Sequence, residues 1–240
     1  MASEIGRGAF QRSSMVLSLD LDDLVEATER AVQLAPYFGI VRVGLELFCA
    51  SGPESIAAFR ERGFCVFADL MLHDTPSSAH KAARVLGAVG ASYVTIHAQG
   101  GLEMMQAAVE GLYAGSDGAG LERPTALAVT VLPTDTDAPP HIVPQRVRMA
   151  VVAGCGGLVC AAADLPAARE AGPELLRVVP GIRPMGELWP DQPRSVTAAE
   201  AVEAGADLLV VGRAVLGSPD PIAAAERLFH VAPPAGITVS

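Results

Sequence analysis

Eight short apolar runs recur along the 240-residue chain, and each is followed by a segment with helical spacing. The runs are MVLSLD (15–20), IVRVGL (40–45), FCVFADL (64–70), SYVTIH (92–97), TALAVTVL (125–132), GGLVC (156–160), LRVVPGI (176–182) and DLLVVGR (207–213). Runs of this kind are typical of parallel strands that are buried on both faces. Eight strand and helix units in this length, with no GxGxxG after the first strand, predict a single-domain (β/α)8 TIM barrel rather than an open doubly wound sheet.

Residues that begin and end helices support this division of the chain. Predicted starts are Asp22, Pro53, Pro76 and Thr197, and predicted ends are Gly63, Gly90 and Gly205. Residues 1–13 precede the first strand, and we expect them to form a flexible N-terminal tail.

Composition excludes several classes of function. Half of the residues are hydrophobic and the mean hydropathy is +0.36, so the chain can bury a large core and is not disordered. A net charge of −10 would repel nucleic acid. No secretory signal and no run of about 20 apolar residues is present, which predicts a cytoplasmic protein that does not enter a membrane. The four cysteines show no metal-ligand spacing, and we expect small buried core residues at Cys49, Cys65, Cys155 and Cys160.

Ionisable residues stand within or just after several of the predicted strands, where a strand buried on both faces should end apolar. These residues are Asp20, Arg42, Asp69, Asp74, His97, Arg183 and Arg213. Each of them alone could cap a helix or form a local pair. In a barrel, however, the C-terminal ends of all strands meet at one mouth, where active sites are built. The pattern therefore predicts a small-molecule site that is rich in both charges.

The last two strands indicate what this molecule carries. The segments PGIRP (180–184) and GRAVLGSPD (212–220) each place a glycine and an arginine directly after a strand. The usual phosphate site of a barrel lies there, and an arginine can bind a phosphate through two hydrogen bonds. We therefore expect a phosphorylated substrate, either a nucleoside or a sugar.

The segment VFADLMLHDTPSSAHKAA resembles the third-strand signature of the orotidine 5′-phosphate decarboxylases, DLKxHDIPNT. The similarity continues in order through VRVGLELF, VTIHAQGG, AVTVL, LVCAA, VVPGIRP and VVGRAVLGSPDP. The resemblance implies a carbon-carbon lyase that decarboxylates a pyrimidine nucleotide without a cofactor or metal, and a homodimer. The Ala-rich segment 77–90 would permit close packing across the dimer interface.

The resemblance also implies roles for single residues. Asp20 would contact the ribose, and Asp69 and Asp74 would be the carboxylates of the active-site charge network, with Asp74 entering the partner's site. His97 would be structural. The residues implied to hold the phosphate are Gly181, Arg183, Gln192, Gly212 and Arg213.

Several positions depart from the family pattern. The catalytic lysine is replaced by Met71, and the lysine of the second strand by Arg42. The serine that contacts the pyrimidine becomes Thr134, after Pro133. Methionine can neither stabilise negative charge nor deliver a proton, and Arg42 stays protonated, so it is a counter-ion and a poor acid. Without the lysine, Asp69 and Asp74 must share a proton, lie apart, or both bind Arg42.

We therefore favour a divergent lyase-like enzyme that decarboxylates orotidine 5′-phosphate weakly or not at all, with Asp69 or Asp74 as acid or base. Two alternatives remain: a non-catalytic nucleotide-binding homologue, and a decarboxylase altered at position 71. Further departures at Arg42, Pro133 and Ser77 argue against the second. Whether Mg²⁺ replaces the missing cation also stays open.

Overall fold

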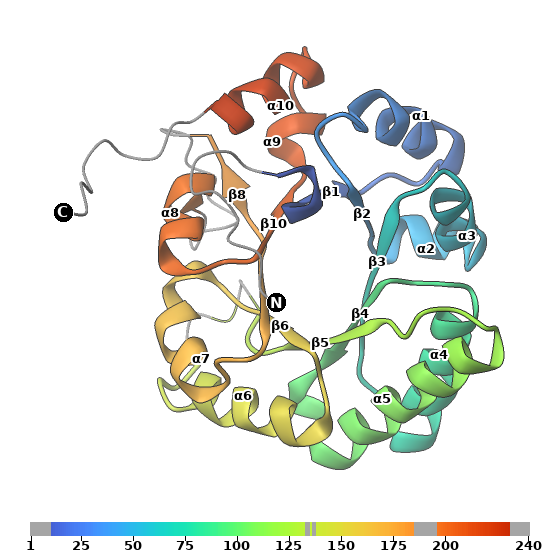
Figure 1. The fold of residues 1–240 in the computed structure, drawn as a ribbon, viewed down its shortest axis with the longest axis vertical. Coiled ribbons are helices and arrows are strands. Elements are labelled where there is room, and N and C mark those ends of the chain that lie inside the picture. Colours follow the sequence, from blue (N-terminus) through green and yellow to red (C-terminus); the bar gives the residue numbers. More distant parts are fainter. Residues whose placement is uncertain (1–10, 133–134, 136–137, 185–195, 231–240) are drawn as a thin grey trace.

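The computed structural model describes residues 11–132, 135, 138–184 and 196–230. Within these residues, eight parallel strands close into a barrel in the order β1-β10-β7-β6-β5-β4-β3-β2, and helices surround it (Figure 1). The barrel strands are β1 (Met15–Leu19), β2 (Ile40–Val43), β3 (Cys65–Leu72), β4 (Tyr93–His97), β5 (Thr125–Val129), β6 (Gly157–Val159), β7 (Leu176–Val179) and β10 (Leu208–Val211). The predicted (β/α)8 barrel is confirmed, and no described helix is long and apolar enough to cross a membrane.

The surrounding elements include several that the sequence pattern did not predict. The helices are α1 (Leu24–Leu34), α2 (Leu45–Ser51), α3 (Glu54–Glu61), α4 (Pro76–Ala88), α5 (Gly101–Gly118), α6 (Ile142–Ala153), α7 (Leu165–Ala171), α8 (Ala198–Ala204), α9 (Arg213–Leu216) and α10 (Pro221–His230). Helix α2 follows β2 directly because Gly44 ends the strand and precedes the helix. The short strands β8 (Ile182–Arg183) and β9 (Val196–Thr197) pair with each other beside the barrel. Short 3-10 helices lie at Arg12–Ser14, Ala98–Gly100 and Ala162–Asp164.

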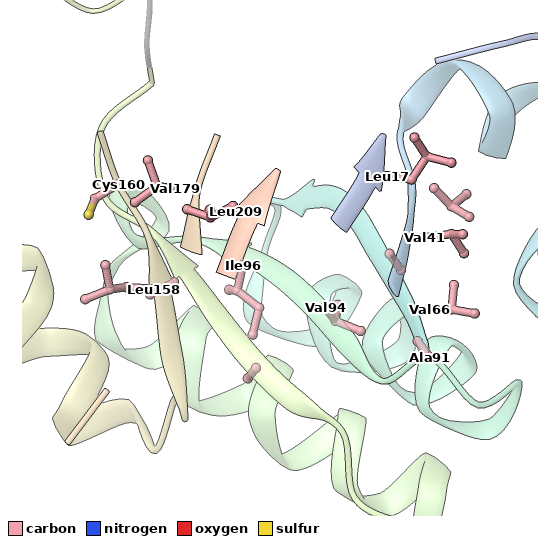
Figure 2. Close-up of a cluster of buried hydrophobic side chains, with 14 of the residues drawn as sticks. Leu17, Val41, Val66, Ala91, Val94, Ile96, Leu158, Cys160, Val179 and Leu209 are labelled. Atoms are coloured by element: carbon pink, nitrogen blue, oxygen red, sulfur yellow. The ribbon is translucent and has the colours of Figure 1, made fainter. Parts of the chain in front are cut away.

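The strands divide the core into two layers, because successive side chains of a strand point to opposite faces. One layer lies between the strands and the helices, and Figure 2 shows part of it, including Leu17, Val41 and Val66 on neighbouring strands. The other fills the barrel interior and contains Val16, Ile40, Phe67, Leu127, Val178, Leu208 and Val210. Two residues further along β1, β2 and β3, the same inward face carries polar side chains. The alternation thus places the apolar floor and the polar mouth of the barrel.

One boundary prediction is corrected. Helix α1 is capped by Asp23 rather than Asp22, and the Asp23 carboxylate accepts hydrogen bonds from the backbone N–H groups of Val25 and Glu26. Of the predicted N-terminal tail, residues 1–10 lie outside the described residues. Arg12 begins a short 3-10 helix and donates a side-chain hydrogen bond to the carbonyl of Phe38 at 3.2 Å.

The small residues of α4 serve packing within one chain. A Cβ atom at Gly111 of α5 would lie 2.2 Å from the carbonyl oxygen of His80, and one at Gly115 would lie 2.0 Å from that of Arg84. Gly87 of α4 is equally close to the backbone of α5. The buried face of this Ala-rich helix thus packs against α5 of the same chain, and its packing across a dimer interface stays a prediction.

The cysteines form no disulfide, but their predicted burial is only half right. Cys155 and Cys160 are buried, and burial raises the pKa of the Cys155 thiol to about 12. Cys49 and Cys65 are exposed. Cys65 begins β3, where the strand enters the barrel from the rim, and Cys49 lies on α2.

Candidate functional site

A cavity of about 250 Å³ opens at the C-terminal mouth of the barrel. It brings together charged and polar residues that are far apart in the sequence. They are Ser18, Asp20, Arg42, Asp69, Arg183 and Arg213. Apolar side chains form the rest of the wall, among them Phe67, Met71, Val129, Val159 and Val210. The prediction that the ionisable residues of the strand ends converge at one mouth thus holds for five of the seven residues and leaves out Asp74 and His97.

The guanidinium of Arg42 joins two carboxylates across β1, β2 and β3. Its Nε donates to Asp69 at 2.5 Å, and its Nη1 donates to Asp20 at 2.8 Å. Ser18 accepts from the same Nη1 at 2.7 Å and donates to Asp20 at 2.9 Å. Burial opposes the charge of Arg42, but the carboxylates of Asp69 and Asp20 outweigh it and raise the pKa of Arg42 above its ordinary value. Arg42 is therefore a fixed cation.

A buried threonine on β4 supports this network and was not among the predicted site residues. The hydroxyl of Thr95 donates to Asp69 at 2.8 Å and accepts the backbone N–H of Met71, also at 2.8 Å. Thr95 is fully buried. The sequence held a signal for it and for Ser18: Thr95 is two residues before His97 and Ser18 two before Asp20, so each shares a strand face with a predicted site residue.

The backbone of Met71 is strained. Its φ is 48°, the only positive φ at a non-glycine residue in the described part of the chain. The pairing of β3 with β4 is irregular between Ala68 and Leu72, which allows this conformation. The left-handed region costs an L-residue about 1–2 kcal/mol. The fold therefore accepts a local cost and places residue 71 in the cavity wall.

Asp74 lies apart from the network. It is exposed, follows β3 in the turn before α4, and does not line the cavity. Its carboxylate accepts the backbone N–H of Thr75 at 2.6 Å, and this bond, with help from Ser78, lowers the pKa of Asp74. The sequence left three arrangements open: Asp69 and Asp74 share a proton, lie apart, or both bind Arg42. In the single chain they lie apart, and Arg42 pairs with Asp69 and with Asp20.

The arginine side of the cavity lies on the neighbouring part of the barrel. Arg183 is buried on β8, Gly181 has a φ of 78°, and Gly212 is followed directly by Arg213 at the start of α9. Because β10 pairs with β1, Gly212 lies beside Ser18. The predicted contacts Thr134 and Gln192, and Pro133, lie outside the described residues.

His97 closes β4 outside the cavity lining. Its Nδ1 accepts the backbone N–H of Gln99 at 3.2 Å, and its ring stacks on that of His73 with the centroids 5.3 Å apart. Burial, and then the neighbouring His73 and Arg146, lower the pKa of His97.

The supply of possible proton donors is limited. The sequence contains one lysine, Lys81, which lies exposed on α4 and does not line the cavity. The cations that line it are arginines, which do not release a proton near neutral pH. Among the described residues, no three His, Cys, Asp or Glu side chains form a group that could hold a metal ion.

Comparisons with known proteins agree on one family. A model of the orotidine 5′-phosphate decarboxylase / HUMPS family matches residues 13–228. Orotidine 5′-phosphate decarboxylase from Anaeromyxobacter dehalogenans is 45% identical over 88% of this chain and 94% of its own. The enzyme of the same name from Moorella thermoacetica is 39% identical, over 90% and 91% of the two chains. The crystal structure of orotidine 5′-phosphate decarboxylase from Lactobacillus acidophilus superimposes with a TM-score of 0.75 at 31% identity, over 89% of this chain and 96% of that one.

Proposed function

Because the chain belongs to the orotidine 5′-phosphate decarboxylase / HUMPS family, a family of carbon-carbon lyases, we propose that its cavity binds a nucleoside 5′-monophosphate and that it decarboxylates orotidine 5′-phosphate very slowly, if at all. The observation that carries this proposal is Met71. It lines the cavity beside an intact pair of Arg42 and Asp69, where the family signature has its catalytic lysine.

The binding half of the proposal rests on the two sides of the cavity. Arg183, Arg213 and the glycine turns before them supply cations and close backbone approach for a phosphate, with Gln192 as a further contact. Asp20 lies between this side and Arg42, since its carboxylate binds Arg42 and lies next to Gly212, and a ribose hydroxyl attached to the bound phosphate would contact it there. The base would then extend toward Asp69 and the apolar wall. The family resemblance assigns a contact with the base to Thr134, which lies outside the described residues.

The chemical half of the proposal follows from the charge that decarboxylation creates. Breaking the bond between the ring and the carboxylate releases CO₂ and leaves an electron pair on the ring carbon, and a proton must then fill that position. Met71 has no proton to give and no positive charge. Arg42 is held by two carboxylates and its raised pKa makes it a still weaker acid. A positioned proton donor is typically worth about 10²–10⁴ in rate, and that factor is missing here.

We propose further that the protein is a homodimer in which Asp74 completes the partner's site. Asp74 is ionised, exposed and outside the cavity of its own chain, so its carboxylate is available to a second copy. Light scattering should give a mass of about twice 24.7 kDa at micromolar concentration. A monomer that still binds nucleotide would contradict the dimer.

Calorimetry with uridine 5′-monophosphate, the product of the family reaction, tests the binding site. Arg213→Ala should weaken binding by about 1.5–3 kcal/mol, since it removes a hydrogen bond to a charged group. Arg227→Ala, on α10 away from the cavity lining, is the matched control and should bind as the unmodified protein does. Equal affinities in all three proteins would contradict the proposed phosphate site.

A further inference from the structure

We propose that this cavity selects nucleotides whose base carries no negative charge, so that orotidine 5′-phosphate itself is a poor ligand. This inference rests on the proposed function and names the substrate class of the same site. It follows from the charges that surround the place where the base would lie.

The carboxylate side of the cavity has an uneven count of charges. Asp20 and Asp69 supply two negative charges and Arg42 supplies one positive charge. Arg42 is engaged with both carboxylates at once, through Nε and through Nη1. Its positive charge is therefore already shared when a ligand arrives. Within one chain, the described residues on this side of the cavity present a net charge of −1, and an Asp74 from a second copy would add to it.

The other cations that line the cavity do not correct this imbalance. Arg183 and Arg213 follow β7 and β10, on the far side of β1 from Arg42 and Asp69. A phosphate carries about two negative charges at neutral pH, so it would balance these two arginines when it binds between them. The base would then lie against the carboxylate side of the cavity, which carries the net negative charge.

The rest of the wall beside Asp69 on the same strand is apolar, with Met71 and Phe67 in its lining. Such a wall offers no hydrogen-bond donor to a second carboxylate, and it keeps water away from one. Charges interact more strongly where water is excluded. A carboxylate on the base would therefore meet Asp69 across a poorly screened gap, whereas a neutral or cationic base would not.

Met71 is the residue that determines this selection. A lysine held by the same strained backbone would make the net charge of this side more positive by one and could bind a carboxylate directly. Methionine keeps a similar length and removes the charge. The departures at Met71 and Arg42 then have one consequence in common: the carboxylate side of the cavity has, among the described residues, a single cation that is fixed between two carboxylates.

The relative affinities of two nucleotides test the selection. The affinities of uridine 5′-monophosphate and orotidine 5′-phosphate are measured by calorimetry at pH 7.5, with the absorbance of each sample checked to show that orotidine 5′-phosphate is not converted. The unmodified protein should bind uridine 5′-monophosphate about tenfold more tightly or better, as expected for one opposed charge. Met71→Leu should keep this ratio, and Met71→Lys should bring it toward one or reverse it. Because Met71→Lys is expected to convert orotidine 5′-phosphate, its affinity for this ligand is taken from the concentration dependence of the initial rate, and its affinity for uridine 5′-monophosphate from competitive inhibition.

The outcomes separate this inference from the proposed function. Arg213→Ala should weaken both ligands by a similar factor and leave their ratio unchanged, because the phosphate is common to both. Equal affinities in the unmodified protein, or a ratio that Met71→Lys does not alter, would overturn the selection while the phosphate site stands. If neither nucleotide binds to the unmodified protein, the proposed function fails and the selection fails with it.

Discussion

The hydroxyl of Thr95 donates a hydrogen bond to Asp69 and accepts the backbone N–H of Met71 at the same time. One buried side chain thus orients a carboxylate of the charge network and supports the strained conformation beside it. The frame that would aim a catalytic residue into the cavity is therefore present, although the side chain it aims is a methionine.

Replacing Thr95 by valine keeps the shape of the side chain and removes the hydroxyl. The N–H of Met71 and one oxygen of Asp69 then lose a partner in a fully buried place. We expect the free energy of unfolding to fall by about 1–3 kcal/mol in urea denaturation. Thr95→Ser keeps the hydroxyl and loses one methyl group, so it should cost about 0.8 kcal/mol. If the serine variant lost as much as the valine variant, the hydrogen bonds would not be the cause.

Removing the cation between the two carboxylates should destabilise the protein. In Arg42→Met, the Asp69 side chain, which is 8% exposed, loses its ionic partner. Breaking a buried pair from one side typically costs about 3–5 kcal/mol, and we expect the free energy of unfolding to fall by an amount near the lower end in urea denaturation at pH 7. Arg42→Lys keeps the positive charge and should lose less, and equal losses in the two variants would contradict this account.

His97 should make the stability depend on pH below its ordinary pKa of 6.5. Its pKa in the folded protein lies below its ordinary value of 6.5, so between the two values the unfolded chain binds more protons and acid favours unfolding. Protonation of Nδ1 would also remove the acceptor for the N–H of Gln99. His97→Asn can accept the same bond without titrating. Chemical denaturation at pH 7 and pH 5 should therefore show a smaller fall for His97→Asn than for the unmodified protein, and equal falls would contradict the assignment.

The repeated strand and helix units of the fold could be predicted from the sequence. Buried strands that alternate with helices leave one closed architecture, and within it Asp20, Arg42 and Asp69 had to meet, because each stands at the C-terminal end of a parallel strand. Ser18 and Thr95 were missed because a single small polar residue is compatible with an apolar strand. Because every second side chain of a strand points to the same face, the positions of Asp20 and His97 would have placed Ser18 and Thr95 on the inward face.

Other features depend on local geometry that the spacing of residues does not contain. Asp74 is five residues after Asp69, but the irregular pairing of β3 and the positive φ of Met71 change the direction of the chain between them. The small residues of α4 could have packed against a second chain or against α5, and only the fit of Gly111 and Gly115 against the backbone of α4 distinguishes the two. The exposure of Cys65 similarly depends on where the barrel rim falls.

The central claim, that a missing proton donor at position 71 slows decarboxylation, is tested most directly by turnover of orotidine 5′-phosphate. The loss of its absorbance is followed under identical conditions with the unmodified protein, Met71→Lys, Met71→Leu and the Anaeromyxobacter dehalogenans relative. The unmodified protein and Met71→Leu should be slower than the relative by a factor of about 10² or more, and Met71→Lys should recover part of that factor. Turnover by the unmodified protein at the rate of the relative would contradict the claim, because it would show that the reaction proceeds with Met71 in place.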